Sequence, residues 1–196
     1  MVKSRGQMST NHLPDDETAR FYLRQRTRAE AVDIVAYASL PEESIPAGYP
    51  AVETVAEELY YKEQIDPCNW AKENIPSGYG ITLEGTNKDI GSIDFPHRHG
   101  DRVLEMGYRL HPDYWGQDIG PQAERAMLKD GLQLLALGKI ILSCHDYNKQ
   151  SLAVARKLGF TLERVSEEIQ VPAGRVCRDE TWGNRREEWE RYSCSL

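Results

Sequence analysis

Two glycines and the residues around them give the clearest sign of chemistry in this sequence. The stretch 114–120 reads YWGQDIG and links an apolar, strand-like segment to an amphipathic helix. Pro121 suits the first turn of that helix, because proline has no N–H to leave unpaired there. Unpaired backbone N–H groups and the helix dipole at such a start favour an anion. The pattern predicts a site for a phosphate-bearing ligand around Gly116, Ile119 and Gly120.

A second apolar segment and a short helix follow this loop. The helix is expected to begin at Asn148, a residue type that caps helices well, and to stop at Gly159. The stretch 102–160 therefore reads as one strand–helix–strand–helix unit. The other segments of the chain must be arranged around it.

The sequence context of several other reactive side chains indicates an ordinary structural role. His97 and His99 have a spacing seen in metal sites, but they lie in an expected turn with no clear third ligand, so we expect no metal. His145 and Asp146 are neighbours on a strand and should point to opposite faces, which excludes a simple dyad. Cys144 lies in an apolar strand and is expected to be a core thiol.

Composition sets the broad class. The chain has 196 residues, 40% hydrophobic content and a formal net charge of −7, which fits one globular domain and disfavours nonspecific binding of nucleic acid. Its four cysteines form no CxxC pair, and the sequence shows neither a signal peptide nor a long apolar run. We therefore expect a cytoplasmic protein with reduced thiols and no membrane segment.

The elements expected from the hydrophobic pattern form one mixed α/β domain. Residues 1–17 have few apolar anchors and are expected to be a flexible leader, followed by a single domain over 18–196. Prolines predict irregular structure over 41–50, and Pro67, Asn69, Pro76 and Gly78 predict another loop. The expected order is βααβββαβαββ, with strands at 19–24, 80–83, 90–95, 102–110, 139–144, 161–171 and 175–182, a turn at 97–101, and helices at 27–40, 52–65, 121–135, 148–158 and 185–192.

This order, together with three local motifs, resembles the GNAT acyltransferase superfamily. The motifs are Leu104–Tyr108 (LEMGY), the loop 114–120, and Asn148–Ser151 (NKQS) followed by Lys157–Phe160 (KLGF). The third is the most specific, and it is closest to the branch of ribosomal-protein N-terminal acetyltransferases. The resemblance implies a strongly bent mixed sheet flanked by helices, with acetyl-CoA as co-substrate beside the central strand.

The resemblance also implies roles for individual residues. The cofactor pyrophosphate would contact Gly116, Gln117, Asp118, Ile119 and Gly120. Backbone N–H groups of Met106, Gly107 and Tyr108 would stabilise the oxyanion where strands splay, aided by a bulge at Gly107.

Three side chains carry the remaining steps of acyl transfer. Glu105 can take the proton of the amine, with an outward carboxylate paired to an Arg as the alternative. Ser151 would give a proton to the departing thiolate, and Asn148 would bind the pantetheine arm. Simple helix capping is the alternative for both residues. Tyr147 is a less favoured proton donor.

Two positions depart from the family pattern. Asp118 replaces a usual Gly and puts a carboxylate beside the expected pyrophosphate, although Asp tolerates left-handed backbone angles well. If the carboxylate faces the phosphates, binding is weakened; if it turns outward, the site is unaffected. Ala155 stands where many members carry a Tyr that protonates the thiolate.

The sequence therefore predicts an acetyl-CoA-dependent N-acetyltransferase that transfers acetyl directly to a primary amine, on a peptide N-terminus or a small molecule. A noncatalytic acyl-CoA sensor or scaffold is the alternative, favoured by Asp118 and Ala155. A nucleotide-binding module of another type is a distant third. The acidic charge balance favours a cationic acceptor, and either a monomer or a homodimer fits the sequence.

Overall fold

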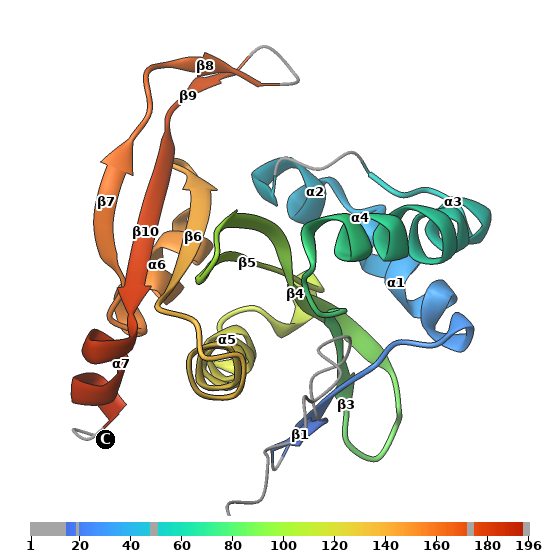
Figure 1. Ribbon diagram of the computed structural model, residues 1–196. Coiled ribbons are helices and arrows are strands. Elements are labelled where there is room, and N and C mark those ends of the chain that lie inside the picture. Colours follow the sequence, from blue (N-terminus) through green and yellow to red (C-terminus); the bar gives the residue numbers. More distant parts are fainter. Residues whose placement is uncertain (1–14, 19, 48–50, 172–174, 194–196) are drawn as a thin grey trace, which may run out of the picture.

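A computed structural model describes residues 15–18, 20–47, 51–171 and 175–193 (Figure 1). Its strands are β1 (Asp16–Glu17), β2 (Phe21–Arg24), β3 (Tyr79–Leu83), β4 (Asp89–Gly100), β5 (Val103–Leu110), β6 (Lys139–His145), β7 (Thr161–Val165), β8 (Ile169–Gln170), β9 (Val176–Cys177) and β10 (Asp179–Arg185). Its α-helices are α1 (Ala31–Ala38), α2 (Pro41–Ala47), α3 (Val55–Tyr60), α4 (Asp66–Glu73), α5 (Ile119–Lys129), α6 (Lys149–Lys157) and α7 (Arg186–Ser193). Short 3₁₀ turns at Arg28–Glu30 and Pro112–Tyr114 and π-helical turns at Tyr61–Ile65 and Asp130–Leu134 extend or join them.

Eight strands form one sheet in the order β1-β2-β3-β4-β5-β6-β10-β7, while β8 and β9 pair separately. In the large sheet only β5 and β6 run parallel among the described strands, and every other neighbouring pair is antiparallel. Figure 1 shows α1 to α4 grouped on one side of β4 and β5, with α5 on the other side, and the sheet opening between β5 and β6. The predicted bent, mixed sheet flanked by helices is confirmed.

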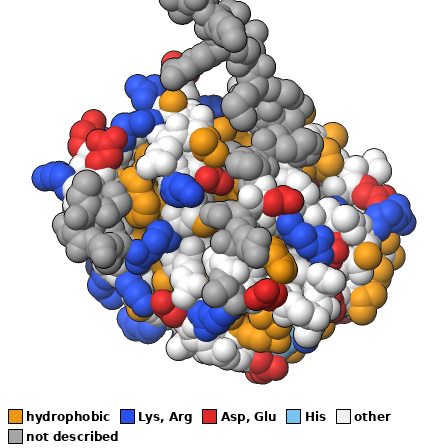
Figure 2. Space-filling model, turned by 90° about the horizontal axis from the view of Figure 1, so that it is seen from below, with side chains coloured by type: hydrophobic (Ala, Val, Ile, Leu, Met, Phe, Trp, Pro, Cys, Tyr) orange, Lys and Arg blue, Asp and Glu red, His pale blue; other side chains and the backbone are white. Residues whose placement is uncertain are grey.

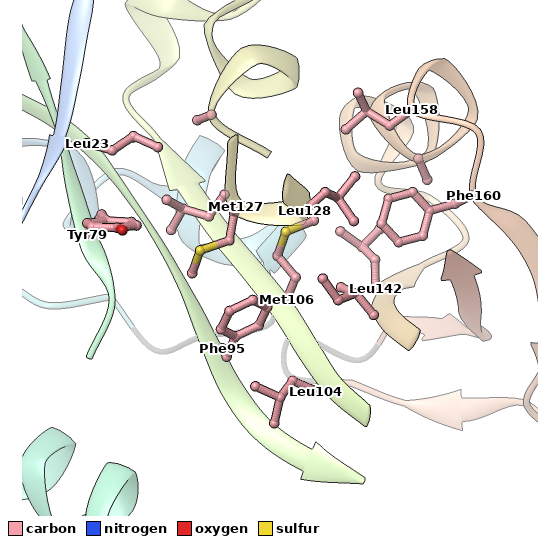
Figure 3. Close-up of a cluster of buried hydrophobic side chains, with 14 of the residues drawn as sticks. Leu23, Tyr79, Phe95, Leu104, Met106, Met127, Leu128, Leu142, Leu158 and Phe160 are labelled. Atoms are coloured by element: carbon pink, nitrogen blue, oxygen red, sulfur yellow. The ribbon is translucent and has the colours of Figure 1, made fainter. Parts of the chain in front are cut away.

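The main core lies between the sheet and α5. Along β5, Leu104, Met106 and Leu110 point to one face, because alternate residues of a strand share a side. They pack with buried side chains of α5 and the neighbouring strands, including Met127, Leu128, Phe95 and Leu142 (Figure 3). Burial of each such side chain contributes about 1.5–3 kcal/mol to folding. This packing holds the central strand rigidly under the site described below.

The segment predicted to be an irregular connector is a helix. Residues 41–47 form α2, with Pro41 in the first turn, where a missing N–H costs nothing. The helix is held on the sheet by Arg109 of β5, whose Nε and Nη2 donate to the carboxylate of Glu43 at 2.7 and 2.5 Å. Residues 48–50 of the same prediction lie outside the described residues. A tertiary ion pair therefore decides a structure that the prolines alone do not indicate.

The second predicted helix is also longer than expected. It starts at the capping box of Thr54 and Glu57 and continues past Pro67 to Glu73. A π-helical turn, Tyr61–Ile65, directly precedes α4, in which Pro67 is the second residue, and such a turn interrupts the regular hydrogen bonding that a proline cannot join. The loop predicted from Pro67, Asn69, Pro76 and Gly78 is therefore wrong at the first two residues, which are helical, and right at the last two, which lie between α4 and β3.

Other boundaries differ in smaller ways. The sheet begins at Asp16 and Glu17, inside the expected leader, whose residues 1–14 lie outside the described part. The turn predicted at 97–101 is shorter, because β4 continues to Gly100. The single strand predicted at 161–171 is divided into β7 and β8, since β8 leaves the large sheet to pair with β9. The Pro-Ala-Gly turn at 172–174 lies outside the described residues.

The surface carries mixed charge. On the face drawn in Figure 2, Lys and Arg side chains lie among Asp and Glu side chains, without a broad patch of one sign. Among the described residues, no helix is both long and apolar enough to cross a membrane. The terminal helix α7 docks through Trp189, which is 4% exposed.

The contact between β4 and β5 gives a test of the fold. A Cβ on Gly91 would lie 2.3 Å from the backbone oxygen of Arg109, so Gly91→Ala must displace β5. We expect it to lower the free energy of unfolding by about 1–3 kcal/mol in chemical denaturation. Gly138→Ala is the control, because its Cβ would meet nothing closer than 3.7 Å. Equal stability of Gly91→Ala and the wild type would contradict this packing.

Candidate functional site

A cavity of about 250 Å³ opens between the parallel strands β5 and β6. These strands pair at only three positions, ending with Glu105 opposite Ile141, and then diverge. The cavity lies directly beyond the last pair and is lined by Glu105–Tyr108 of β5 and Leu142–His145 of β6, together with Pro46, Asn148, Ser151 and Asp179. Divergence of two paired strands is what creates the space.

The same divergence leaves a backbone donor facing the gap. The N–H of His111 donates to the carbonyl oxygen of Ile90 on β4. Because N–H groups alternate sides along a strand, those of Met106 and Tyr108 point away from β4, towards β6. The last pair with β6 is Glu105 with Ile141; its hydrogen bonds come from the residues on either side of Glu105, so the N–H of Met106 closes the ladder and that of Tyr108 lies beyond it. The interruption expected around 106–108 is therefore present, although the bulge lies between Asp94 and His97 on β4 and not at Gly107.

The start of α6 forms one wall of this cavity. The Ser151 N–H donates to Oδ1 of Asn148 at 3.1 Å, so Asn148 caps the helix, and its Nδ2 donates to the carbonyl oxygen of Pro46 at 3.0 Å. The Ser151 hydroxyl is free of the cap and donates to the Tyr108 hydroxyl at 3.4 Å. Capping is thus the role of the Asn148 side chain and of the Ser151 backbone, and the Ser151 hydroxyl is left at the cavity.

Tyr108 holds its proton firmly. Burial raises the pKa of its hydroxyl well above the usual range, and the negative charge of Glu124 adds to this shift. The hydroxyl is therefore neutral across the physiological pH range. Two neutral hydroxyl groups, from Tyr108 and Ser151, lie together on the wall of the cavity.

The glycine loop is shaped as a helix start. Gly116 and Asp118 have left-handed backbone angles, with φ of 71° and 65°. The first helical bond of α5 runs from the Gln122 N–H to the Asp118 carbonyl, so the N–H groups of Ile119 and Gly120 precede the helical ladder. The Gln117 side chain donates to the carbonyl oxygen of Asp113 at 2.7 Å, which ties the loop to the preceding turn. These are the features predicted for an anion site.

The charge of Asp118 is compensated within the protein. Its carboxylate forms an ion pair with Lys157 of α6 and accepts a hydrogen bond from Gln122, while 45% of its side chain remains exposed. The hydrogen bond from Lys157 is the largest cause that lowers the pKa of Asp118. The carboxylate is thus not an isolated charge beside the loop. Lys157 was not predictable as the partner of Asp118, because it lies beyond the next strand and near the end of the next helix.

Glu105 pairs with a histidine and not with an arginine. Its carboxylate lies 2.7 Å from Nε2 of His99, and 16% of its side chain is exposed. His97 has another partner, Glu73, at 3.6 Å, so the two histidines do not converge. Glu105 borders the cavity, but its partner lies on the β4–β5 hairpin.

One group of potential metal ligands was missed from the sequence. His145, Cys177 and Asp179 have ligand atoms within 4.8 Å of one another. Nδ1 of His145 lies 2.6 Å from Asp179 and 3.7 Å from the Cys177 sulfur, so both partners contact the same ring nitrogen. A nucleophile and a carboxylate on one nitrogen do not form a catalytic triad. Asp179 reaches His145 only because β10 pairs with β6.

Cys144 is not activated. Burial raises the pKa of its thiol to about 12, which keeps the sulfur protonated and poorly nucleophilic. It also borders the cavity. The thiol predicted to lie in the core is therefore half-buried at the edge of the core, and this environment keeps it unreactive.

Comparison with known proteins adds to this geometry. A family model described as an acetyltransferase (GNAT) domain matches residues 20–161. The uncharacterized N-acetyltransferase YnaD of Bacillus subtilis (strain 168) is 30% identical over 112 residues, which is 57% of this chain and 65% of that relative. The match thus spans less than two thirds of the relative's length.

Solved structures share the fold at low sequence identity. A GNAT-family acetyltransferase from Bacillus anthracis superposes with a TM-score of 0.77 and 19% identity, covering 89% of this chain and 100% of that one. The ribosomal-protein-S5-alanine acetyltransferase from Vibrio fischeri gives 0.72 and 17%, covering 90% and 98%. The microcin C7 self-immunity acetyltransferase MccE, solved with acetyl-CoA and AMP, gives 0.70 and 18%, covering 86% and 93%. With the family model matching most of its length, the chain belongs to the GNAT acetyltransferase domain family.

Proposed function

We propose that this protein is an acetyltransferase that moves the acetyl group of acetyl-CoA directly to a primary amine. The observation that carries the proposal is the gap between β5 and β6, in which the N–H of Tyr108 faces a cavity beside the start of α6. Acetyl-CoA supplies an activated thioester. The protein needs to supply an anion site, an oxyanion site, a proton acceptor and a proton donor.

The glycine loop fits the pyrophosphate. N–H groups of Ile119 and Gly120 come before the first helical hydrogen bond, and Gly116 has no side chain to obstruct an approaching ligand. The loop is anchored by Gln117 and by the pair of Asp118 with Lys157. A phosphate there would find donors and a nearby cation.

The cavity fits the thioester. The N–H of Tyr108 would donate to the oxyanion, and the missing side chain at Gly107 leaves the backbone open. Asn148 would shape the pantetheine channel mainly by tying α6 to α2, because both ends of its amide are already hydrogen-bonded. Ser151 would give its proton to the thiolate, held in place by Tyr108.

Two residues, Asp118 and Ala155, favoured the alternative of a noncatalytic acyl-CoA sensor or scaffold, and the argument from Asp118 no longer applies. Asp118 favoured it because of repulsion with phosphate, but that carboxylate is paired with Lys157. Ala155 does lack the hydroxyl of a tyrosine and is fully buried. The hydroxyl groups of Ser151 and Tyr108 offer another source for the proton. The cytoplasmic location and the absence of a nucleic-acid partner stay predictions.

Calorimetry and a release assay test the proposed function. Acetyl-CoA is titrated into the protein, and free CoA thiol is then followed in the presence of a panel of primary amines. We expect saturable binding and amine-dependent release of CoA. Absence of acetyl-CoA binding would rule out both the enzyme and the sensor, whereas binding without release by any amine would favour the sensor.

Ser151→Ala separates catalysis from capping. The hydroxyl takes no part in the cap, so we expect an unchanged melting temperature and nearly unchanged acetyl-CoA affinity, with the acyl-transfer rate lowered about 10²-fold. Asn148→Ala is the contrasting variant, because it removes the cap and should cost about 1 kcal/mol of stability. A Ser151→Ala protein that is destabilised but transfers acetyl at the normal rate would contradict the assignment.

Lys157→Met tests the compensation of Asp118. Without its partner, the Asp118 carboxylate should repel the pyrophosphate and weaken acetyl-CoA binding about three- to fivefold at low salt, since exposed ion pairs contribute less than about 1 kcal/mol.

Two further proteins complete this test. The double variant Asp118→Asn with Lys157→Met should bind nearly as well as the wild type, because no charge is left unpaired. Lys129→Met, at the far end of α5, is the control for loss of a lysine. If Lys157→Met binds acetyl-CoA as tightly as the wild type at low salt, the compensation plays no part in binding.

A further inference from the structure

A second cavity, of about 320 Å³, lies under α1, α3 and α4. It meets the first cavity at Gly107 and Tyr108, which line both. Figure 1 shows that these helices cover the side of β4 and β5 away from α5. A molecule in the second cavity would therefore approach the central strand from the side opposite to the α5 core.

Two carboxylates in this second cavity have no partner. Asp94 of β4 lies directly opposite Gly107 in the ladder, and its Oδ1 is 3.5 Å from the position that a Cβ on Gly107 would take. Asp66 of α4 lines the same cavity. Among the described residues, neither side chain has a hydrogen bond or an ion pair. Partly buried carboxylates without partners are costly, so a cation from outside would satisfy them.

The cationic side chains at this cavity are already engaged. Arg109 forms two hydrogen bonds with Glu43, and Arg26 lies 3.9 Å from Glu58. With Glu43 and Glu58 set against these two arginines, Asp94 and Asp66 are acidic groups in excess, and Arg26 lowers the pKa of both. The local field thus favours a positive ligand group near Gly107.

Much of the remaining lining is apolar. It includes Ile34, Val52, Ile65 and Trp70. An occupant that fits both parts has an ammonium group at one end and a small apolar body at the other. A long polycation or an anionic ligand would leave this apolar lining or the carboxylates unmatched.

We propose that the second cavity is the acceptor site, that it binds a small primary amine with an apolar body, and that Asp94 is the catalytic base. This inference rests on the proposed function. The ammonium gives one proton to Asp94, and the amine nitrogen attacks the thioester carbon, so that a C–N bond forms and the C–S bond breaks. The thiolate takes the hydroxyl proton of Ser151. The second proton that the amine nitrogen loses then restores the Ser151 hydroxyl. Asp94 then returns its proton to solvent.

The titration of Asp94 suits this role. Burial raises its pKa to about 6, an effect increased by Asp66 and opposed by Arg26, Arg109 and His97, which face it from the neighbouring elements. Above that pH the carboxylate is ionised and can accept a proton; below it the group is protonated and cannot. Transfer should therefore fall as the pH is lowered through about 6.

Asp94→Asn tests the base with 2-phenylethylamine as the acceptor probe. We expect kcat/KM at pH 7.5 to fall about 10²-fold or more, with loss of the acidic limb of the pH profile and unchanged acetyl-CoA affinity. Asp101→Asn, in the exposed turn after β4, is the matched control and should behave as the wild type. If Asp94→Asn keeps the wild-type rate and pH profile while Glu105→Gln loses activity, the base is Glu105 and the proposal is overturned.

Binding of the probe tests the site without relying on turnover. Calorimetry should show that 2-phenylethylamine binds more tightly than 2-phenylethanol, which has the same body without the charge, and that Asp94→Asn weakens this preference at least fivefold. Equal binding of the two compounds, or no binding of the amine, would overturn the acceptor site. Acetyl-CoA binding in the same protein would show that the proposed function survives that result.

Gly107→Ala tests the passage between the cavities. Its Cβ would meet Pro96 at 3.4 Å and Asp94 at 3.5 Å, which are ordinary contacts, so the fold should be retained. The methyl group would stand between Asp94 and the thioester, and we expect transfer to fall at least tenfold with an unchanged melting temperature. Gly100→Ala is the control, because its Cβ would meet nothing closer than 3.9 Å. Normal transfer by Gly107→Ala would contradict an approach of the amine across this residue.

Discussion

The parallel pairing of β5 with β6 is short, and its end determines where the site forms. Three residue pairs hold the two strands together, and beyond Glu105 they separate. Backbone groups released from a ladder need other partners, and burying them without any is unfavourable. The separation is tolerated here because β5 stays paired with β4 on its other edge, apart from the irregularities at 94–97 and 98–100, and is packed against α5 through Leu104 and Met106. A strand that is rigid on one edge and open on the other is what a site for an acyl group requires.

Contacts distant in the sequence keep the gap open. Asn148 joins the start of α6 to the carbonyl of Pro46, and Arg109 joins β5 to Glu43. Both hold α2 against the diverging strands. Side chains that would otherwise be candidates for ligand binding thus maintain the shape of the cavity, while backbone N–H groups and the Ser151 hydroxyl remain for the ligand.

The charged side chains on the two sides of β5 differ in whether they are paired. Near the glycine loop, Asp118 and Lys157 compensate one another, so that the donors of the helix start determine the preference for an anion. In the second cavity, the arginines are paired while Asp94 and Asp66 are not, which determines a preference for a cation. Two substrates of opposite local charge can then meet at a glycine, where no side chain separates them.

The sequence by itself determined the central part of this protein. The loop 114–120, the capping residue Asn148 and the alternation of Leu104 and Met106 are local patterns, and each set the expected element because its physical cause acts within a few residues. Helix α2 and the continuation past Pro67 were not predictable in this way, since an ion pair and a π-helical turn override the prolines. The partners of Asp118, Glu105 and His145 come from other elements, and the place of Asp94 opposite Gly107 depends on the β4–β5 register. Which charges are paired and which face a cavity was therefore decided only by the tertiary structure, because pairing depends on distances that the order of residues does not contain.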